Sequence, residues 1–451
     1  MSMTRMRRTD LFWLLICSGI SIVWGISGAQ SATGWADFKS VYYGTRCLIQ
    51  HHDPYVLREL NGVRRVDEER RQSEGIQTCP PLGLYINLPI TSLFVAPFAM
   101  LPWGPAHLLW MMVTAGSLIL AAILMCDLGA GFAPKVSVFL ICFLLANCEL
   151  VFCGGNTAGI VVGLCLVAAW SFLRGRYVPA GTVCMAISLA MKPHDAGLVW
   201  LYFLLAGGVY RKRALQTLLL TAVLWGMALL WVEPVAPHWM EELHSNLSAL
   251  SVPGGINEPG PASFSGRKAS MVIDLQAAIS VIRDDPRIYN LTSYGICGAF
   301  LLVWSIRTLK LQFSQRRAWL ALGAIVPLSM LVTYHRPWDA KLLMLTVPAC
   351  AMLWAEGGRI RWIAFLVTAA GIVSTADIPL AILSMLLNNL DVEIGGGFGQ
   401  ILRVVLMQPV PLVLLTMGIF YLWMYLRRDP ARTSTKDAEK QKDTPIELRP
   451  A

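Results

Sequence analysis

The chain has 451 residues, of which 55% are hydrophobic and 14% are charged, and its mean hydropathy is +0.56. Soluble domains carry charge on about a quarter of their residues, so this composition excludes an ordinary soluble protein. The formal net charge of +9 comes from short Lys and Arg clusters between apolar runs, a pattern typical of cytoplasmic loops, and we therefore exclude nucleic-acid binding.

Apolar runs recur from one end of the chain to the other. A helix of about 17–25 residues crosses the hydrocarbon of a bilayer, and the alternation of a membrane barrel is not seen. We predict an all-α, polytopic membrane helical bundle with about 12 spans within residues 1–426. The first run, Leu11–Ile26, follows several arginines without a convincing cleavage site. It therefore reads as an uncleaved first span that starts in the cytoplasm.

A long polar loop, residues 31–85, follows this span and opens an amphipathic segment near Asp37. Pro54 should end that helix near His52. The residues expected on its apolar face are Phe38, Val41, Tyr42, Thr45, Leu48 and Ile49. An Asp at a helix start caps free backbone N–H groups, and the helix dipole also keeps it ionised and ready to accept a proton. Both readings of Asp37 stay open, and we take it as the candidate catalytic base.

The later apolar runs predict the rest of the bundle. They lie at about residues 86–101, 106–126, 135–152, 156–173, 178–191, 196–209, 215–231, 291–306, 318–334, 340–354, 362–373 and 401–425. The stretch from Cys153 to Asn156 breaks this series, and one flanking segment is expected to be a half-span or re-entrant piece. Basic clusters between the runs predict that both termini are cytoplasmic, and the tail 427–451 is expected to be disordered.

Three further stretches are expected at the outer face with the first loop: residues 192–195, the long loop 233–290, and residues 334–339. They carry the candidate cations Lys192, His194, His335 and Arg336. Charges near hydrocarbon are costly and often mark functional sites. Cations that hold a leaving phosphate, opposite a carboxylate that takes a proton, suit the transfer of a group from a lipid phosphate.

Plainer readings of these residues stay open. Lys192 can snorkel at a span end, and His335 with Arg336 can form an interfacial anchor paired with Asp339. Tyr42 and Tyr43 suit an aromatic belt at the interface as well as a sugar-binding surface. Cys47 and Cys79 share the first loop and are candidates for a disulfide.

The motifs in their order resemble the GT-C superfamily of polytopic glycosyltransferases, most closely family 87, the polyprenyl-phosphate-mannose-dependent mannosyltransferase-like group. The matching motifs are Asp37-Phe38, Tyr42-Tyr43, Asp53-Pro54-Tyr55, Asn87-Leu88-Pro89 through Ala96-Pro97 and Leu101-Pro102, Gly155-Asn156, Ala190-Met191-Lys192-Pro193, and His335-Arg336-Pro337-Trp338-Asp339. The resemblance covers roughly residues 10–355. It departs from the family pattern at His51-His52, where a Gly is common, and at Asn156, where Gln is usual. These departures leave the sugar and the acceptor open.

The resemblance implies an inverting sugar transfer on the outer leaflet, with Asp37 as base and with Lys192 and His335 near the donor phosphate. Some GT-C enzymes need a divalent metal, but a lone Asp37 without a clustered second acid argues against one, and no metal or cofactor is expected.

Our leading hypothesis is a multi-pass glycosyltransferase of the bacterial inner (plasma) membrane whose site faces the periplasm or exterior. It would move a mannose-like hexose from a polyprenyl-phosphate donor to a glycan or lipid acceptor. The candidate substrate-binding residues are Lys192, His194, His335, Arg336, Tyr42 and Tyr43. The main alternative is a transporter or flippase for a lipid-linked or anionic solute. A third is a ligase of lipid-linked glycans, with basic residues Arg267, Lys268, Arg283 and Arg287 in its large loop.

Overall fold

A computed structural model describes residues 7–29, 35–73, 82–252, 255, 257–259, 272–388, 404–405 and 408–427. Within these ranges the regular structure is helical throughout, and the predicted all-α polytopic membrane bundle is confirmed. Three sequence-based expectations lie outside the described residues. They concern Cys79 as a disulfide partner, the basic pair Arg267 and Lys268, and the tail beyond Arg427.

Six helical segments of the described chain are long and apolar enough to cross a membrane. They are α1 (Arg8–Ala29), α5 (Trp103–Ala130), the segment Pro134–Gly154, α11 (Gly208–Val232), α14 (Pro286–Lys310) and α20 (Pro409–Leu426). A seventh is present if α17 (Gly358–Ser374) and α18 (Asp377–Asn388), bent by 69° at their junction, are one broken span. The chain is thus a multi-pass membrane protein, and the expected total of about 12 crossings stays a prediction.

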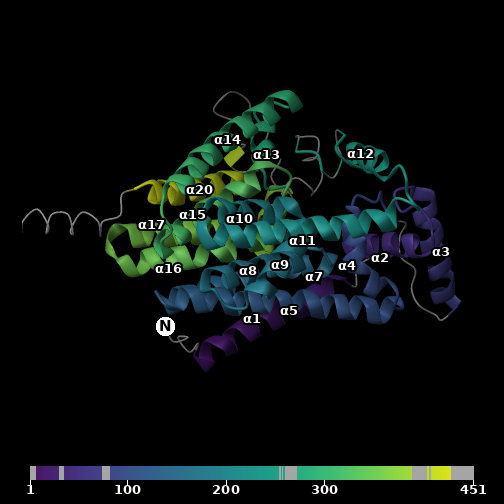
Figure 1. Cartoon of the computed structure of the whole chain (residues 1–451), viewed down its shortest axis with the longest axis horizontal. Helices are drawn as coiled ribbons and strands as arrows, with labels where there is room; N and C mark the ends of the chain where they lie inside the picture. The colour runs from purple at the N-terminus through teal and green to yellow at the C-terminus, as the bar shows by residue number, and fades with distance from the viewer. Residues whose placement is uncertain are drawn as a thin grey trace, which may run out of the picture.

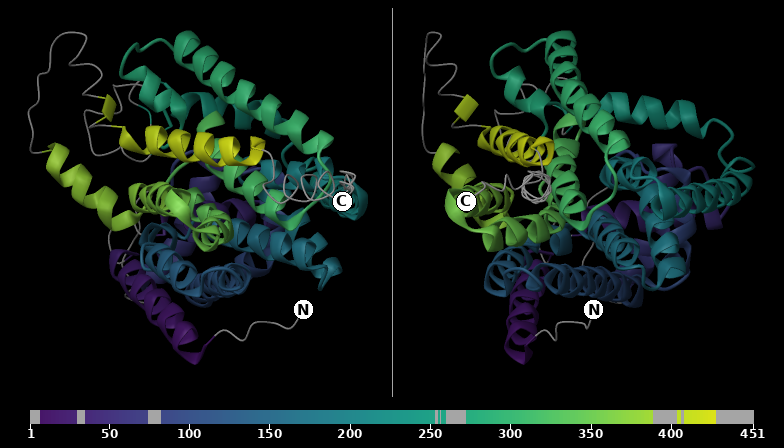
Figure 2. Two further views of the ribbon diagram at one scale, coloured as in Figure 1. Left: turned by 90° about the vertical axis from the view of Figure 1, so that its left-hand side faces the viewer. Right: turned by 60° about the vertical axis from the view of Figure 1, so that its left-hand side comes forward.

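The long helices surround shorter ones. Figures 1 and 2 show α1 along the edge of the bundle in every view, and it exposes large apolar side chains such as Phe12 and Trp13. The shorter helices are α4 (Pro89–Ala99), α8 (Ala158–Arg174), α9 (Val178–Met191), α10 (Pro193–Leu205) and α16 (Val347–Glu356), and α15 (Gln315–Val332) is as long as α20. α15 is buried from Ala318 to Leu331, which identifies it as the centre of the core.

Two expected spans are divided differently in the structure. In place of a segment at 135–152, the chain forms α6 (Pro134–Leu145) and α7 (Glu149–Gly154), and α8 follows the expected break at the glycines. In place of a span at 340–354, a 3₁₀ helix, η3 (Asp339–Thr346), leads into α16. The backbone at the first interruption is satisfied, because the Asn147 carbonyl accepts a hydrogen bond from the Lys341 ammonium.

The two long polar loops meet at one end of the bundle. They contain α2 (Ala36–Ile49), α3 (Leu57–Ser73), α12 (Trp239–Leu250) and α13 (Leu275–Ser280), and Figure 1 shows α2, α3 and α12 together at the right-hand end. The Asn246 amide of α12 joins the loops by donating to the carbonyls of Tyr55 and Tyr85, each at 3.1 Å. The predicted apolar face of α2 is buried except at Ile49, which is half-buried. This packing fixes the helix that carries Asp37.

Candidate active site

The start of α2 is held by the break between α7 and α8. Trp35 precedes the helix in a left-handed conformation, with φ of 61°, and its backbone N–H donates to the Cys153 carbonyl at 2.7 Å. Gly155 also has a positive φ, of 62°, and a Cβ there would lie only 2.7 Å from the Phe38 side chain. The Trp110 indole N–H donates to the Gly155 carbonyl at 2.9 Å. Glycine at this turn therefore allows both the backbone conformation and the close approach of α2.

Asp37 lies in the first turn of α2, with its carboxylate over this turn. The Asn156 side-chain amide donates to Asp37 Oδ2 at 2.7 Å, and Asn156 Oδ1 accepts from the Ala158 backbone N–H at 2.8 Å. One side chain thus caps the start of α8 and orients the Asp37 carboxylate. A Cβ on Gly154 would lie 3.1 Å from Asp37 Oδ2, so the site has no room for a larger residue on that side.

Lys192 occupies the bend between α9 and α10. Pro193 begins α10 and disfavours helical backbone at Lys192, so the two helices cannot be continuous. The Lys192 ammonium lies 2.6 Å from Asp339 Oδ1 and 3.4 Å from Asp195 Oδ2. The other oxygen of Asp339 accepts the Arg336 backbone N–H at 2.8 Å. Asp339 therefore ties the 192–195 segment to the segment that follows α15.

Both candidate histidines face Asp195. The Nε2 atoms of His194 and His335 lie 3.6 and 3.5 Å from Asp195 Oδ1, and the ring centroids are 5.1 Å apart. His335 is almost fully buried, and its Nδ1 lies 2.8 Å from the Thr333 carbonyl. Lys192, His194 and His335 are thus brought into one cluster.

Arg336 is held beside this cluster by ring stacking and a polar contact. Its guanidinium lies 5.2 Å from the ring centroids of both Tyr334 and Trp338, and Nη2 donates to Asn257 Oδ1 at 3.0 Å. Stacking between two aromatic rings restricts the planar guanidinium to one orientation.

The charges of the cluster act on Asp37. Burial raises the pKa of the Asp37 carboxyl above its usual value, while the Asn156 hydrogen bond and the positive charges of Arg336 and Lys192 oppose this rise. The carboxylate therefore shares one electrostatic environment with these cations, although they are far apart in the sequence. A raised pKa brings a carboxylate closer to the range in which it is an effective general base.

The cluster itself is a compensated set of charges. Burial disfavours the Lys192 ammonium, but Asp195 and Asp339 outweigh burial and raise its pKa. Burial alone would raise the pKa of Asp339, and Lys192 reverses that effect, so this pair is ionised. Burial and the neighbouring Asp339 raise the pKa of Asp195 to about 6.

The two candidate tyrosines are buried within α2's packing surface. Tyr42 donates to the Leu101 carbonyl at 2.8 Å, and Tyr43 donates to Asp67 Oδ2 at 3.0 Å. Both rings pack against Trp103, with centroids 5.2 and 6.2 Å away. These contacts anchor α2, and a role in binding substrate stays a prediction.

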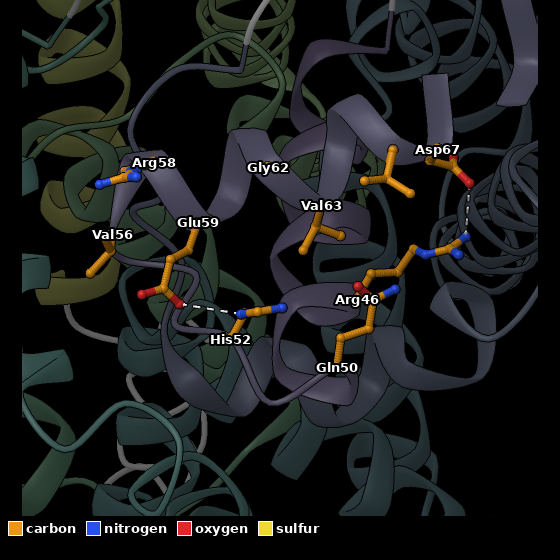
Figure 3. Close-up of a pocket in the computed structure, with 10 residues that line it drawn as sticks. Arg46, Gln50, His52, Val56, Arg58, Glu59, Gly62, Val63 and Asp67 are labelled. Atoms are coloured by element: carbon orange, nitrogen blue, oxygen red, sulfur yellow. Dashed lines mark ion pairs between the residues drawn. The ribbon is translucent and has the colours of Figure 1, made fainter. Parts of the chain in front are cut away.

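A separate pocket of about 640 Å³ lies between α2 and α3 (Figure 3). Two ion pairs border it: Arg46 with Asp67 at 3.6 Å, and His52 with Glu59 at 3.7 Å. None of the site residues predicted from the sequence lines this pocket, so it is separate both from Asp37 and from the cluster of Lys192, His194 and His335.

Asp195 and Asp339 were not among the predicted site residues, although both are central to the cluster. Each lies within three positions of a predicted cation, Lys192 or Arg336, and this spacing was the available signal. Asn156 was singled out only as the end of the break after Cys153 and as part of the Gly155-Asn156 motif, without a role at the site. Its bond to Asp37 joins residues 119 positions apart, which no local pattern reveals.

Comparison with known proteins gives one family match. No curated protein and no solved structure matches the chain. The model of glycosyltransferase family 87 matches residues 85–333, which is more than half of the chain. The matched region contains Asn156, Lys192, His194 and Asp195, while Asp37 and the segment from His335 to Asp339 lie on either side of it. The chain therefore belongs to glycosyltransferase family 87 and is a membrane glycosyltransferase.

Proposed function

We propose that this glycosyltransferase transfers a hexose, mannose-like in its stereochemistry, from a polyprenyl-phosphate donor to a glycan or lipid acceptor, with inversion at the anomeric carbon. Asp37 is the general base, and Lys192, His194, His335 and Arg336 bind the donor phosphate. The observation that supports this most strongly is the Asp37 carboxylate, oriented by Asn156 and acted on by the charges of Lys192 and Arg336.

The reaction assigns a role to each charge. A hydroxyl oxygen of the acceptor attacks the anomeric carbon while its proton passes to the Asp37 carboxylate. The bond between that carbon and the phosphate oxygen breaks on the opposite face, and its electron pair stays with the phosphate. Negative charge then increases on the leaving group. Lys192 and Arg336 stabilise this charge, and because their positions are already fixed, little reorganisation is needed.

Asp339 and the tyrosine pair act through other residues. Asp339 positions Lys192 by the 2.6 Å ion pair and holds the Arg336 backbone, so it is a positioning residue. We assign Tyr42 and Tyr43 the corresponding task for α2, because their hydroxyls bond protein groups and their rings pack against Trp103.

We also propose that the site faces the periplasm or exterior of a bacterial inner membrane, with loops 31–85 and 233–290 on that side. α11 has 25 residues and therefore extends about 37 Å. The basic cluster Arg211–Arg213 lies at its start, and α12 follows its end (Figure 1). A cytoplasmic basic cluster puts α12 and the neighbouring α2 outside.

The family match favours a transferase over the transporter that the sequence alone left open. The decisive experiment is transfer by purified protein in nanodiscs, from a radiolabelled polyprenyl-phosphate hexose to acceptor lipid or glycan. Asp37→Asn should reduce kcat by at least about 100-fold, the lower range for loss of a general base, with an unchanged unfolding midpoint. The matched control is Asp284→Asn, an exposed acid in the second loop, which should retain full activity. An active Asp37→Asn enzyme would refute the assigned base.

The cation assignments need a separate measurement. Lys192→Met removes the charge that we place on the donor phosphate, so kcat/KM for the donor should fall by at least tenfold. The KM for the acceptor should change little. If Lys192→Met changed the kinetic constants for the acceptor as much as those for the donor, a phosphate-binding role for Lys192 would be contradicted.

A further inference from the structure

Asp195 Oδ1 and the Nε2 atoms of His194 and His335 face one another, and none of the three has a hydrogen-bond partner among the described residues. His194 and Asp195 lie in the first turn of α10, and His335 follows α15. One ligand atom of each of these three side chains lies within 4.8 Å of the other two, and both histidine Nε2 atoms lie 3.5–3.6 Å from Asp195 Oδ1. The side chains of Asp195 and His335 are 1% and 2% exposed, so water gives these atoms little compensation.

The tautomer of neutral His335 is set by a backbone carbonyl. A carbonyl oxygen only accepts hydrogen bonds, so the 2.8 Å contact with Thr333 places the ring proton of neutral His335 on Nδ1. Its Nε2 then presents a lone pair to the Asp195 carboxylate. Within the described part of the chain, no hydrogen-bond donor reaches either histidine Nε2 or Asp195 Oδ1. Buried acceptors left facing one another in this way are costly.

The spacing suits an ion better than a shared proton. A hydrogen bond between a charged nitrogen and a carboxylate is about 2.7–2.9 Å long. The observed separations from Asp195 Oδ1 are 3.5 and 3.6 Å. Ligands that lie about 2.0–2.2 Å from a tetrahedral metal are about 3.4 Å from each other. The distances from Asp195 Oδ1 to the two histidine nitrogens are therefore close to the ligand–ligand spacing around a metal ion.

We propose that His194, Asp195 and His335 bind a divalent transition-metal ion such as Zn²⁺, with its remaining coordination open to a phosphate oxygen. The bond from His335 to the Thr333 carbonyl is the arrangement that usually orients a metal-bound histidine. Two imidazoles and one carboxylate favour Zn²⁺ or Co²⁺ over Mg²⁺ and Ca²⁺, which prefer oxygen ligands. The proposal departs from the sequence-based expectation of no metal, which was argued only from the lack of a second acid clustered with Asp37.

The surrounding charges explain why phosphate would be the further ligand. Lys192 contacts Asp195 Oδ2 at 3.4 Å and Asp339 at 2.6 Å, so Asp339 balances Lys192 and Asp195 Oδ1 is left for the metal. A bound divalent ion then leaves the cluster with excess positive charge, which an anion neutralises. This phosphate step rests on the proposed function, whereas metal binding alone does not.

The test measures binding directly. Purified protein in nanodiscs is stripped with a chelator, dialysed and titrated with Co²⁺, with visible absorption and bound metal per chain as the readouts. We expect one ion per chain in the unmodified protein, and at least a tenfold weaker affinity in both Asp195→Asn and His335→Ala. The control His244→Ala changes an exposed histidine outside the cluster and should bind normally. Less than half an ion per chain, or binding unchanged by both cluster variants, would overturn the proposal.

Two further measurements separate this inference from the proposed function. Asp37→Asn should bind Co²⁺ as tightly as the unmodified protein while losing transfer. Methyl phosphate, a soluble probe for the donor headgroup, should tighten Co²⁺ binding by about fivefold or more through reciprocal coupling. Full transfer by metal-free protein that binds no Co²⁺ would remove the metal site and leave the base intact. An Asp37→Asn enzyme that binds Co²⁺ normally and still transfers the sugar would refute the catalytic base and leave the metal site intact.

Discussion

Gly154→Ala provides a quantitative test of how tightly the Asp37 carboxylate is positioned. The new Cβ would lie 3.1 Å from Asp37 Oδ2, closer than the ordinary contact range of 3.4–4 Å. The carboxylate must therefore move by a few tenths of an ångström, which also strains its 2.7 Å bond from Asn156. Misplacement by about 1 Å can cost about 100-fold in rate, so we expect kcat to fall about tenfold, or about 1.4 kcal/mol.

The same substitution should not weaken the fold. Gly154 is the last residue of α7, and its φ is not positive, so alanine fits the backbone and favours helix. The assay is kcat in nanodiscs with saturating donor, together with the unfolding midpoint. Gly116→Ala in α5, where a Cβ meets nothing within 4 Å, is the matched control and should have unchanged kcat. Unchanged kcat in Gly154→Ala would refute the claim that this carboxylate position is catalytic.

Two more predictions concern pH dependence and stability. Asn156→Asp keeps an oxygen for the α8 cap but replaces the donor to Asp37 with a second acid, so the pKa of Asp37 rises further. Because the base is active when deprotonated, the acid limb of the kcat/KM profile should move to higher pH by about one unit or more. In the unmodified protein the buried Lys341 ammonium lies 2.8 Å from Asp377 Oδ1, and Asp377→Asn removes this counter-charge. It should destabilise the protein by about 3–5 kcal/mol, measured as a lower unfolding midpoint.

Each of these predictions has its own control. An acid limb that does not move in Asn156→Asp would contradict the assignment of that limb to Asp37. For the ion pair, the double variant Lys341→Met, Asp377→Leu should recover most of the lost stability, because it removes both buried charges. A midpoint for Asp377→Asn equal to that of Asp284→Asn would show that the pair contributes nothing.

Hydropathy alone predicted the class of fold, because an apolar run long enough to cross a bilayer has few alternatives. It also predicted the amphipathic face of α2, since that pattern depends only on helical periodicity. It did not predict the interruption at residues 146–148 or the 3₁₀ helix from Asp339 to Thr346. The two are linked by a tertiary contact, in which the Lys341 ammonium of the 3₁₀ helix donates to the Asn147 carbonyl, and such a contact leaves no local pattern.

In the candidate site, too, the sequence predicted single residues but not the tertiary contacts between them. Charged residues at span ends identified Lys192, His194 and His335, which the structure brings together, because such charges are costly without a purpose. The sequence could not show that Asp195 faces both histidines, since this depends on how α10 is turned relative to the segment after α15. It also could not show that Asn156 reaches Asp37, because that contact depends on the packing of α2 against the turn at Gly155.

The most direct test of the central claim is an experimental structure with a non-hydrolysable polyprenyl-phosphate-sugar analogue bound. We predict phosphate density beside Lys192 and the His194–His335 pair, and the anomeric carbon facing the Asp37 carboxylate across the site. Phosphate density in the pocket between α2 and α3, or a sugar turned away from Asp37, would contradict the account.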